Sequence, residues 1–232
     1  MKKSFLYVIS CFMCTLVSTS IVFAQKIDNL VALKQQSKNE LFHKLKKAPH
    51  TPAFESEGYW VWGSSVVKGE DGKYHMFVSR FPKSLPFHPG WMVASEIVHA
   101  ISDTPQGPYR FSDVALPARG AQYWDGRSTH NPRILKYKGK YYFSYSTGDT
   151  HLLCYAVGDN PYGPFTYQGV ILTPVVGWTT HHSIAEYKGK WYLFHHDCVP
   201  SGGKTWLRSL KVVELEYDEE GKIQTIKGSA DE

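Results

Sequence analysis

The chain has 232 residues, of which 42% are hydrophobic and 15% aromatic, and its formal net charge is +5. This length suits a single large β domain. The charge is too small to indicate nucleic acid or an anionic membrane surface as a partner, and no basic block or glycine-rich phosphate loop accompanies it.

The first 24 residues have the features of a secretory signal peptide. Lys2 and Lys3 give a basic start, Phe5–Phe23 is mostly apolar, and small residues stand at Val22 and Ala24. We expect cleavage after Ala24, a secreted or periplasmic mature protein and no membrane attachment after cleavage. An uncleaved N-terminal anchor is the alternative.

Of the four cysteines, Cys154 and Cys198 remain after this cleavage. Two cysteines do not make a disulfide framework in an exported domain of this size. Buried thiols are therefore expected, and a single disulfide is the alternative.

Residues 25–57 are polar and rich in lysine, with leucines spaced loosely as on a helix. We predict a short helical or linker segment there, which precedes the main domain at residues 58–228.

One sequence phrase occurs three times in that domain: an apolar strand, a tight turn and a second strand. The turns contain Gly72, Gly139 and Gly189, and glycine supplies the positive φ that a hairpin turn requires. Alternating aromatic residues follow each turn and predict strands with two distinct faces. The three copies are "SSVVKGEDGKYHMFVSR" (Ser64–Arg80), "NPRILKYKGKYYFSYST" (Asn131–Thr147) and "HSIAEYKGKWYLFHHD" (His182–Asp197).

A second phrase follows the first two copies, "AISDTPQGPYRFSDVAL" (Ala100–Leu116) and "AVGDNPYGPFTYQGVIL" (Ala156–Leu172). Each predicts a strand, a Pro-x-Gly-Pro turn and an outer strand. In the third position, Ser209–Ile226 predicts another hairpin, closed at Glu220-Gly221.

Repeated four-stranded antiparallel units are typical of β-propeller blades. We therefore predict an all-β propeller with about three recognisable blades, near residues 58–117, 128–174 and 178–227. A β-sandwich is the alternative. Propellers usually close with four or more blades, so either the N-terminal segment or a partner chain, as in a homodimer, covers the open faces, or blades have been lost. We favour the loss of blades.

Residues Tyr137–Ile226 resemble the last two blades of glycoside hydrolase family 43. The members of this family are five-bladed β-xylosidases and α-arabinofuranosidases. The resemblance rests on "YAVGDNPYGPFTYQGVIL", "GWTTHHSIAEYKGKWYLFHHD" and "SGGKTWLRSLKVVELEYDEEGKI". The N-terminal part resembles early blades of the related family 43 and family 117 propeller hydrolases, through "VWGSSVVKGEDGKYHMFVSRFP", "SEIVHAISDTPQGPY" and "LPARGAQYWDGRSTHNP". A truncated or recombined propeller would carry both resemblances.

The resemblance implies a glycosidase that acts on plant or algal polysaccharide fragments. Glycoside hydrolysis requires a carboxylic acid and a second carboxylate, and family 43 enzymes carry these on the innermost strands of successive blades. Here those positions hold Trp62-Gly63-Ser64 and His130-Asn131-Pro132 instead. A propeller remnant that binds glycans without turnover is therefore the alternative function, and an interaction propeller is a weaker one.

Two carboxylates remain as catalytic candidates. Asp125 lies just before an innermost strand, beside Trp124, whose ring could stack on a sugar; the alternative for Asp125 is a turn cap before Gly126. Glu96 could point to the axis or form a salt bridge. Asp149 and Asp197 are interpreted as solvated turn residues.

Substrate-binding candidates lie at the openings of the predicted blades. His130, Asn131, His181 and His182 suit sugar hydroxyls. The resemblance also implies a structural Ca²⁺ near the axis beside His182, although no metal is required, and an arginine that points into the substrate pocket at Arg208. Exposed rings at blade edges could stack on sugar rings; they are Trp60, Trp62, Trp91, Trp124 and Trp178.

Overall fold

The computed structural model describes residues 25, 44, 47, 50–120, 122–123, 126–148, 150–178 and 180–231. Contacts divide the chain into two compact units, Met1–Thr51 and Pro52–Glu232, and every strand given below lies in the second unit. The predicted signal peptide and most of the predicted linker fall outside the described residues. No helix in the described part of the chain has the length and apolar character needed to cross a membrane.

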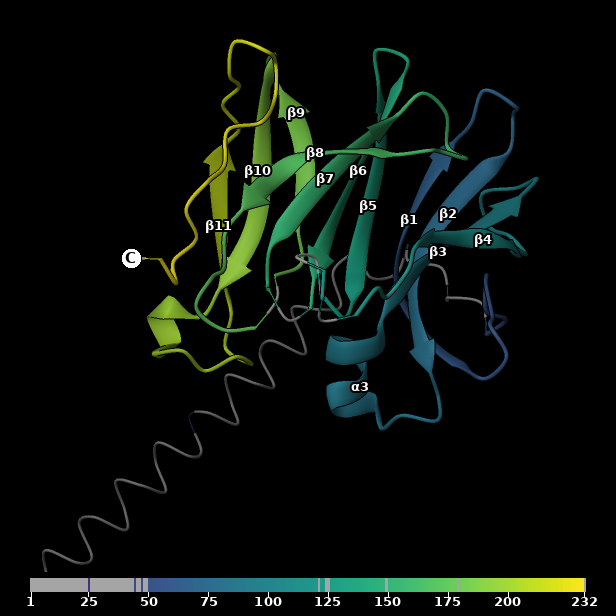
Figure 1. The fold of residues 1–232 in the computed structure, drawn as a ribbon, viewed down its shortest axis with the longest axis horizontal. Helices are drawn as coiled ribbons and strands as arrows, with labels where there is room; N and C mark the ends of the chain where they lie inside the picture. Colours follow the sequence, from purple (N-terminus) through teal and green to yellow (C-terminus); the bar gives the residue numbers. More distant parts are fainter. Residues whose placement is uncertain are drawn as a thin grey trace, which may run out of the picture. The chain divides into compact units, whose positions relative to one another are not determined.

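The second unit consists of three antiparallel sheets (Figure 1). The first sheet has the order β1-β2-β3-β4, with helix α3 (Phe87–Ala94) between β2 and β3; its strands are β1 (Tyr59–Lys68), β2 (Tyr74–Pro82), β3 (Glu96–Ser102) and β4 (Arg110–Leu116). The second sheet repeats this order with β5 (Thr129–Tyr137), β6 (Lys140–Thr147), β7 (Leu153–Gly158) and β8 (Thr166–Leu172). We call these sheets blades 1 and 2. The predicted all-β fold of repeated antiparallel blades is confirmed.

Blade 3 has three strands, β9 (Ser183–Tyr187), β10 (Lys190–Asp197) and β11 (Ser209–Glu214), where the repeat predicted four. A short 3₁₀ helix, η1 (Val199–Ser201), follows β10. After β11 the chain turns at Gly221, but it then leaves the blade: Ile226 pairs in parallel with Leu172 at the end of blade 2. The last segment therefore adds to the neighbouring sheet and leaves β11 as an edge strand.

The glycine turns adopt the predicted backbone conformation. Gly72, Gly139 and Gly189 have φ of 80°, 77° and 79°. In the second and third turns the preceding lysines, Lys138 and Lys188, also have positive φ, of 47° and 53°. Two consecutive residues with positive φ make the type I′ turn, whose twist matches that of the strands it joins.

Adjacent blades pack through aromatic and aliphatic side chains. Between blades 1 and 2, the rings of Phe77 and Phe143 are 4.8 Å apart, and Tyr141 is fully buried beside them. Between blades 2 and 3, Leu153 and Leu193 are 1% and 0% exposed within one cluster. This packing between adjacent blades can hold the first residues of β1, β5 and β9 at fixed positions relative to one another.

The outer strands at both ends keep apolar side chains in solvent. On β4, Phe111 and Val114 are exposed, and on β11, Leu210 and Val212 are exposed. This agrees with the expectation that a three-blade stack leaves its end faces uncovered. Cys154 and Cys198 are both buried, and no disulfide joins these two residues.

Candidate functional site

Three histidines gather where the innermost strands of blades 2 and 3 begin. His130 lies in β5, and His181 and His182 directly precede β9. Burial, followed by the nearby charges of His181, His151 and His182, lowers the pKa of His130 to about 3. Burial, His181 and Arg133 likewise lower the pKa of His182 to about 3. These imidazoles are therefore neutral at pH 7, and a neutral ring has one N–H donor and one acceptor nitrogen.

Arg208 belongs to the same group. Its Nη1 donates to Nε2 of His196, 3.1 Å away, and the backbone N–H of His181 donates to the same nitrogen at 3.0 Å. Two donors on one nitrogen require that His196 carry its proton on Nδ1. Burial, Arg208 and His181 accordingly lower the pKa of His196 to about 4. Arg208 is exposed, and its Nε donates to the backbone carbonyl of Thr205 at 3.1 Å.

Asn131 is placed by two facing β-bulges. The register of β5 against β6 shifts between His130 and Arg133. The register of β1 against β2 shifts between Trp62 and Ser64, at Gly63. Asn131 has φ of 52°, and its backbone N–H donates to Oγ of Ser79 at 3.1 Å. Its side chain is 7% exposed, and Oδ1 has no hydrogen-bond partner among the described residues. Bulges of this kind re-aim side chains next to active sites, and here they hold a buried acceptor that no described residue satisfies.

Aromatic rings form a wall beside the histidines. Trp91, on α3, meets His130 edge-on with ring centroids 5.4 Å apart, and Trp62, on β1, lies 6.4 Å from the same ring. Trp178, in the β8–β9 loop, lies 6.0 Å from Trp91. Two further rings contact Trp178: His88 stacks on it at 5.1 Å, and Trp206 meets it edge-on at 4.9 Å. Such a wall offers CH–π contacts to a sugar ring.

His196, His88 and Trp206 were not predicted as site residues. His196 lies on β10, the second strand of its blade, and reaches the site only because Thr180 and His181 lie against it. The signal for His196 was the doubled histidine in "LFHHD", where alternation sends one ring to each face. Trp206 stands next to Arg208 in the "KTWLRS" loop. Loop conformation decided its position, and a periodic pattern contains no information on that.

The predicted catalytic carboxylates are only partly described. Asp125 and Trp124 lie outside the described residues, as does Asp149. Glu96 is described, and its Oε1 accepts a 2.8 Å hydrogen bond from Nε of Arg80, so it forms the salt bridge that the sequence left open. Glu96 also borders a cavity of about 420 Å³ that includes Gly120 and Arg127, from the loop that carries Asp125.

Asp197 has a structural environment rather than a solvated one. It is 3% exposed, and its Oδ1 accepts hydrogen bonds from Oγ of Ser209 at 2.9 Å and from the N–H of Val199 at 3.3 Å. Burial alone would raise the pKa of its carboxyl, but these hydrogen bonds and the charge of Lys211 lower it. The interpretation of Asp197 as a solvated turn residue was wrong, because Asp197 pairs with Ser209 of β11 and is buried.

The described side chains around His182 do not fit a calcium ion. Ca²⁺ takes six to eight oxygen ligands. Next to His182 stand Oγ of Ser144, at 2.7 Å from Nε2, and the cationic Arg133. Within the described ranges, no group of three or more His, Cys, Asp or Glu residues is arranged to hold a metal ion.

Comparisons with known proteins give consistent relatives, although no family model matches the chain. A curated xylosidase/arabinosidase of Bacteroides ovatus is 86% identical over 93 residues, which are 40% of this chain and 29% of that protein. The chain thus spans less than a third of the length of this relative. A solved family 43 β-xylosidase/α-arabinofuranosidase from a compost microbial metagenome, described as a calcium-free complex with xylotriose, is 31% identical. The match covers 72% of this chain and 73% of that one, with a TM-score of 0.41.

A family 117 glycoside hydrolase from Zobellia galactanivorans is similar in fold. Its sequence identity is 19% and its TM-score 0.54, and the match covers 73% of this chain and 56% of that one. At this identity the match informs on fold alone.

Proposed function

Because the chain belongs to glycoside hydrolase family 43, we propose that it hydrolyses O-glycosidic bonds in plant or algal polysaccharide fragments, in the manner of a β-xylosidase or α-arabinofuranosidase. The observation that carries the proposal is the convergence of His130, His181 and Arg208 from two blades beside one aromatic wall. Hydrogen-bond donors and acceptors next to partly exposed rings are what a sugar requires for binding.

In this proposal the described residues bind and orient the sugar. Arg208 donates charge-assisted hydrogen bonds to a hydroxyl or a carboxylate. Oδ1 of Asn131 accepts from a hydroxyl, and the neutral histidines donate or accept. The tryptophan wall stacks on the less polar face of the ring. These groups would hold a glycosidic bond at the openings of blades 2 and 3.

Bond cleavage needs two carboxyl groups in addition. Asp125 is the proposed carboxylate at the axis. Glu96 is the weaker second candidate, because its ion pair with Arg80 occupies one of its oxygens. We expect Asp125→Asn to abolish turnover and Glu96→Gln to reduce it strongly, since removal of an essential acid or base typically costs on the order of 10²-fold or more.

The test is release of nitrophenol from nitrophenyl β-xyloside and nitrophenyl α-arabinofuranoside, together with calorimetric binding of xylotriose. Turnover that is lost in Asp125→Asn supports the proposal. Xylotriose binding without turnover of either substrate would replace it with the binding-only alternative. Absence of both turnover and binding would end the carbohydrate assignment altogether.

Export is a separate part of the proposal. Its support is the basic, apolar and small-residue pattern that ends at Ala24. Expression with the native N-terminus, followed by N-terminal sequencing of the secreted or periplasmic protein, should give Gln25 as the first residue. An intact Met1 on membrane-bound protein would favour the anchor instead.

The structural calcium and the homodimer remain predictions. The side chains described around His182 offer few oxygens for such an ion. Elemental analysis of the purified protein measures bound calcium directly. For the dimer, the exposed Leu210 and Val212 of β11 are the available apolar contacts, and size-exclusion chromatography with light scattering gives the oligomeric state.

A further inference from the structure

A second cavity lies between blades 2 and 3, at the end where the hairpin turns are. Its volume is about 390 Å³, and Lys138, Gly189 and Gly221, from three different turns, contribute to its lining. This volume is within the range of small-molecule sites. None of the histidines of the candidate site lines it, and Ser144 is the lining residue that also contacts His182.

Aromatic rings form the walls of this cavity. We call it the tyrosine cavity and define it by Tyr137, Tyr142, Tyr155, Tyr217, Trp191 and Lys138. The rings of Tyr137 and Trp191 meet edge-on, with centroids 5.1 Å apart. Burial, followed by the neighbouring phenols of Tyr142, Tyr137 and Tyr155, raises the pKa of Tyr217. Tyr217 thus lies close to the other three phenols, and the hydroxyl of Tyr155 accepts a hydrogen bond from the N–H of Ile223 at 3.0 Å.

The deeper lining is aliphatic. Ile171, Ile184 and Leu215 are 0%, 9% and 4% exposed. Tyr137 and Tyr217 are 38% and 44% exposed, so they lie at the mouth. The cavity thus has an apolar interior below a rim of phenols, which suits a ring with one apolar face and hydroxyls at its edge.

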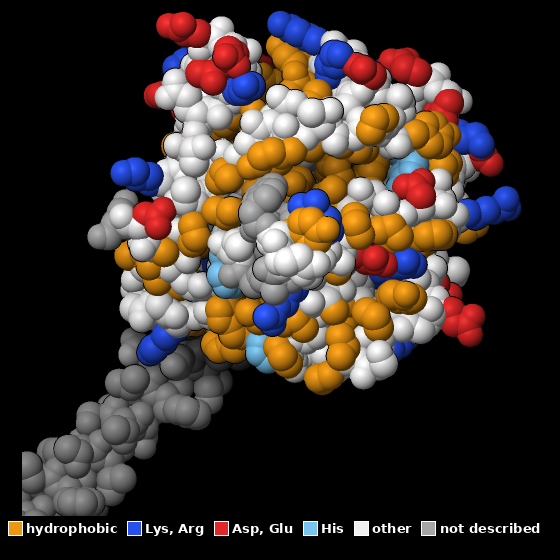
Figure 2. Space-filling view, viewed as in Figure 1, with side chains coloured by type: hydrophobic (Ala, Val, Ile, Leu, Met, Phe, Trp, Pro, Cys, Tyr) orange, Lys and Arg blue, Asp and Glu red, His pale blue; other side chains and the backbone are white. Residues whose placement is uncertain are grey.

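Lys138 adds a positive charge at the mouth. Figure 2 shows charged side chains gathered over the turn end of the sheets. Most of the nearby lysines are neutralised: Lys136 pairs with Glu70, Lys140 with Asp159, Lys190 with Glu214 and Lys222 with Glu220. Nζ of Lys138 instead lies 5.2 Å from the ring centroid of Tyr137, and it contacts no carboxylate among the described residues.

We propose that the tyrosine cavity binds the ring of a hexuronic acid, an acidic sugar, with its carboxylate on Lys138 and its ring against Tyr217 and Trp191. A neutral sugar would make no ionic contact with the ammonium group of Lys138, which lies 5.2 Å from the ring centroid of Tyr137. The choice of a sugar over another ring-shaped acid rests on the proposed function, because a carbohydrate-active chain meets acidic sugars on polysaccharide fragments. The cavity would then hold a branch or a neighbouring chain away from the hydrolytic site.

The chain contains a matched control for Lys138. Lys188 occupies the same position in the next type I′ turn, with φ of 53° against 47°, and its Nζ lies 5.2 Å from the ring of Tyr187. Neither Lys188 nor Tyr187 lines the cavity. Lys138→Met and Lys188→Met therefore make the same chemical change in the same local structure, and only the first touches the proposed site.

The experiment is calorimetric titration of the full chain with sodium D-glucuronate, xylose and 4-hydroxybenzoate. We expect saturable glucuronate binding that weakens about fivefold or more in Lys138→Met, since a charge-assisted hydrogen bond of this kind contributes at least about 1 kcal/mol. Tyr217→Ala should weaken it further. Lys188→Met and Arg208→Gln should leave it unchanged, and the Arg208 variant excludes binding at the histidine site.

The proposal would be overturned by no saturable glucuronate binding, by equal effects of Lys138→Met and Lys188→Met, or by loss of binding in Arg208→Gln. Tighter binding of 4-hydroxybenzoate than of glucuronate would assign the cavity to aromatic acids and refute the proposal that its ligand is an acidic sugar. Glycoside hydrolysis is measured separately, so glucuronate binding without turnover refutes only the proposed function, and turnover without glucuronate binding refutes only this inference.

Discussion

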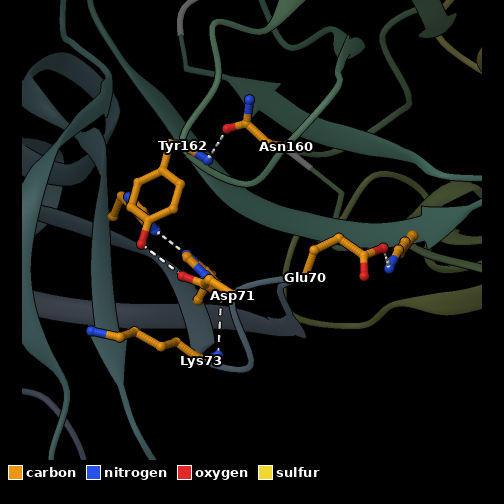
Figure 3. A network of polar contacts seen from close by, with 8 residues as sticks. Glu70, Asp71, Lys73, Asn160 and Tyr162 are labelled. Atoms are coloured by element: carbon orange, nitrogen blue, oxygen red, sulfur yellow. Dashed lines mark hydrogen bonds and ion pairs between the residues drawn. The ribbon is translucent and has the colours of Figure 1, made fainter.

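The phenol of Tyr162, from the β7–β8 turn of blade 2, donates a 2.8 Å hydrogen bond to Oδ2 of Asp71, in the β1–β2 turn of blade 1 (Figure 3). The other carboxylate oxygen of Asp71 accepts from the N–H of Lys73 and contacts Nε2 of His75, both at 3.1 Å. Burial would raise the pKa of Asp71, but the hydrogen bonds from Tyr162, His75 and Lys73 outweigh it and lower the pKa to about 2. The carboxylate of Asp71 thus links the turns of two adjacent blades by hydrogen bonds.

Removal of the Tyr162–Asp71 hydrogen bond should lower the stability of the fold. We expect Tyr162→Phe to reduce the free energy of unfolding by about 1 kcal/mol at pH 7, because a hydrogen bond to a charged group is lost while the ring remains. Tyr187→Phe is the control, since Tyr187 is 61% exposed and lies on blade 3. Urea unfolding of both variants measures the difference, and equal values for the two would contradict a role for the Tyr162–Asp71 bond.

The same substitution should change the acid limb of the stability profile. A depressed carboxyl pKa contributes stability that is present above the unfolded pKa, near 3.9, and is lost as the pH falls through the folded pKa, here about 2. Without the phenol, the folded pKa of Asp71 moves up toward the unfolded value, and this contribution shrinks. The pKa of Asp71, followed by carboxyl NMR, should therefore be higher in Tyr162→Phe.

The buried histidines predict a second, larger pH effect. His130 and His182 have folded pKa values of about 3, whereas an unfolded histidine titrates near 6.5. Between these values the unfolded chain binds more protons, so stability is complete above about pH 6.5 and falls as the pH drops. Each histidine contributes a slope of about 1.4 kcal/mol per pH unit. Unfolding measured at pH 7.5, 6 and 5 should show this decline, and a flat profile over that range would exclude buried neutral imidazoles.

The repeated sequence phrases predict more of the fold than of the candidate site. Glycines 72, 139 and 189 predicted the hairpins, because a positive φ is nearly a requirement on residue type. The pairing of Ile226 with Leu172 was not predictable, because the turn at Gly221 specifies a hairpin but not which sheet receives the chain afterward. His181 was expected at the site from its place at a blade opening and Arg208 from the resemblance, and the structure brings them together through His196. Their roles toward a substrate stay predictions.

Arg208 offers a test that links structure to binding. Its charge contributes to the low pKa of His196, so Arg208→Gln should raise that pKa, which histidine NMR measures. Under the proposed function the same variant should raise KM for nitrophenyl β-xyloside by about tenfold, as expected for loss of a charge-assisted hydrogen bond. Arg110→Gln, on the exposed strand β4, is the control. An unchanged His196 pKa would contradict the contact, and an unchanged KM would remove Arg208 from substrate binding.

Asn131 allows backbone strain and ligand binding to be separated. Its φ of 52° is a left-handed conformation, which costs an alanine about 1–2 kcal/mol but costs glycine almost nothing. Asn131→Ala should therefore be less stable than Asn131→Gly by about 1 kcal/mol in urea unfolding.

Both variants lack Oδ1, the buried acceptor that no described residue satisfies. Under the proposed function, xylotriose binding should weaken to the same extent in Asn131→Ala and Asn131→Gly, whatever their difference in stability. If binding instead follows stability, so that the glycine variant binds like wild type, then Asn131 acts through the bulge alone and its side chain does not contact the sugar.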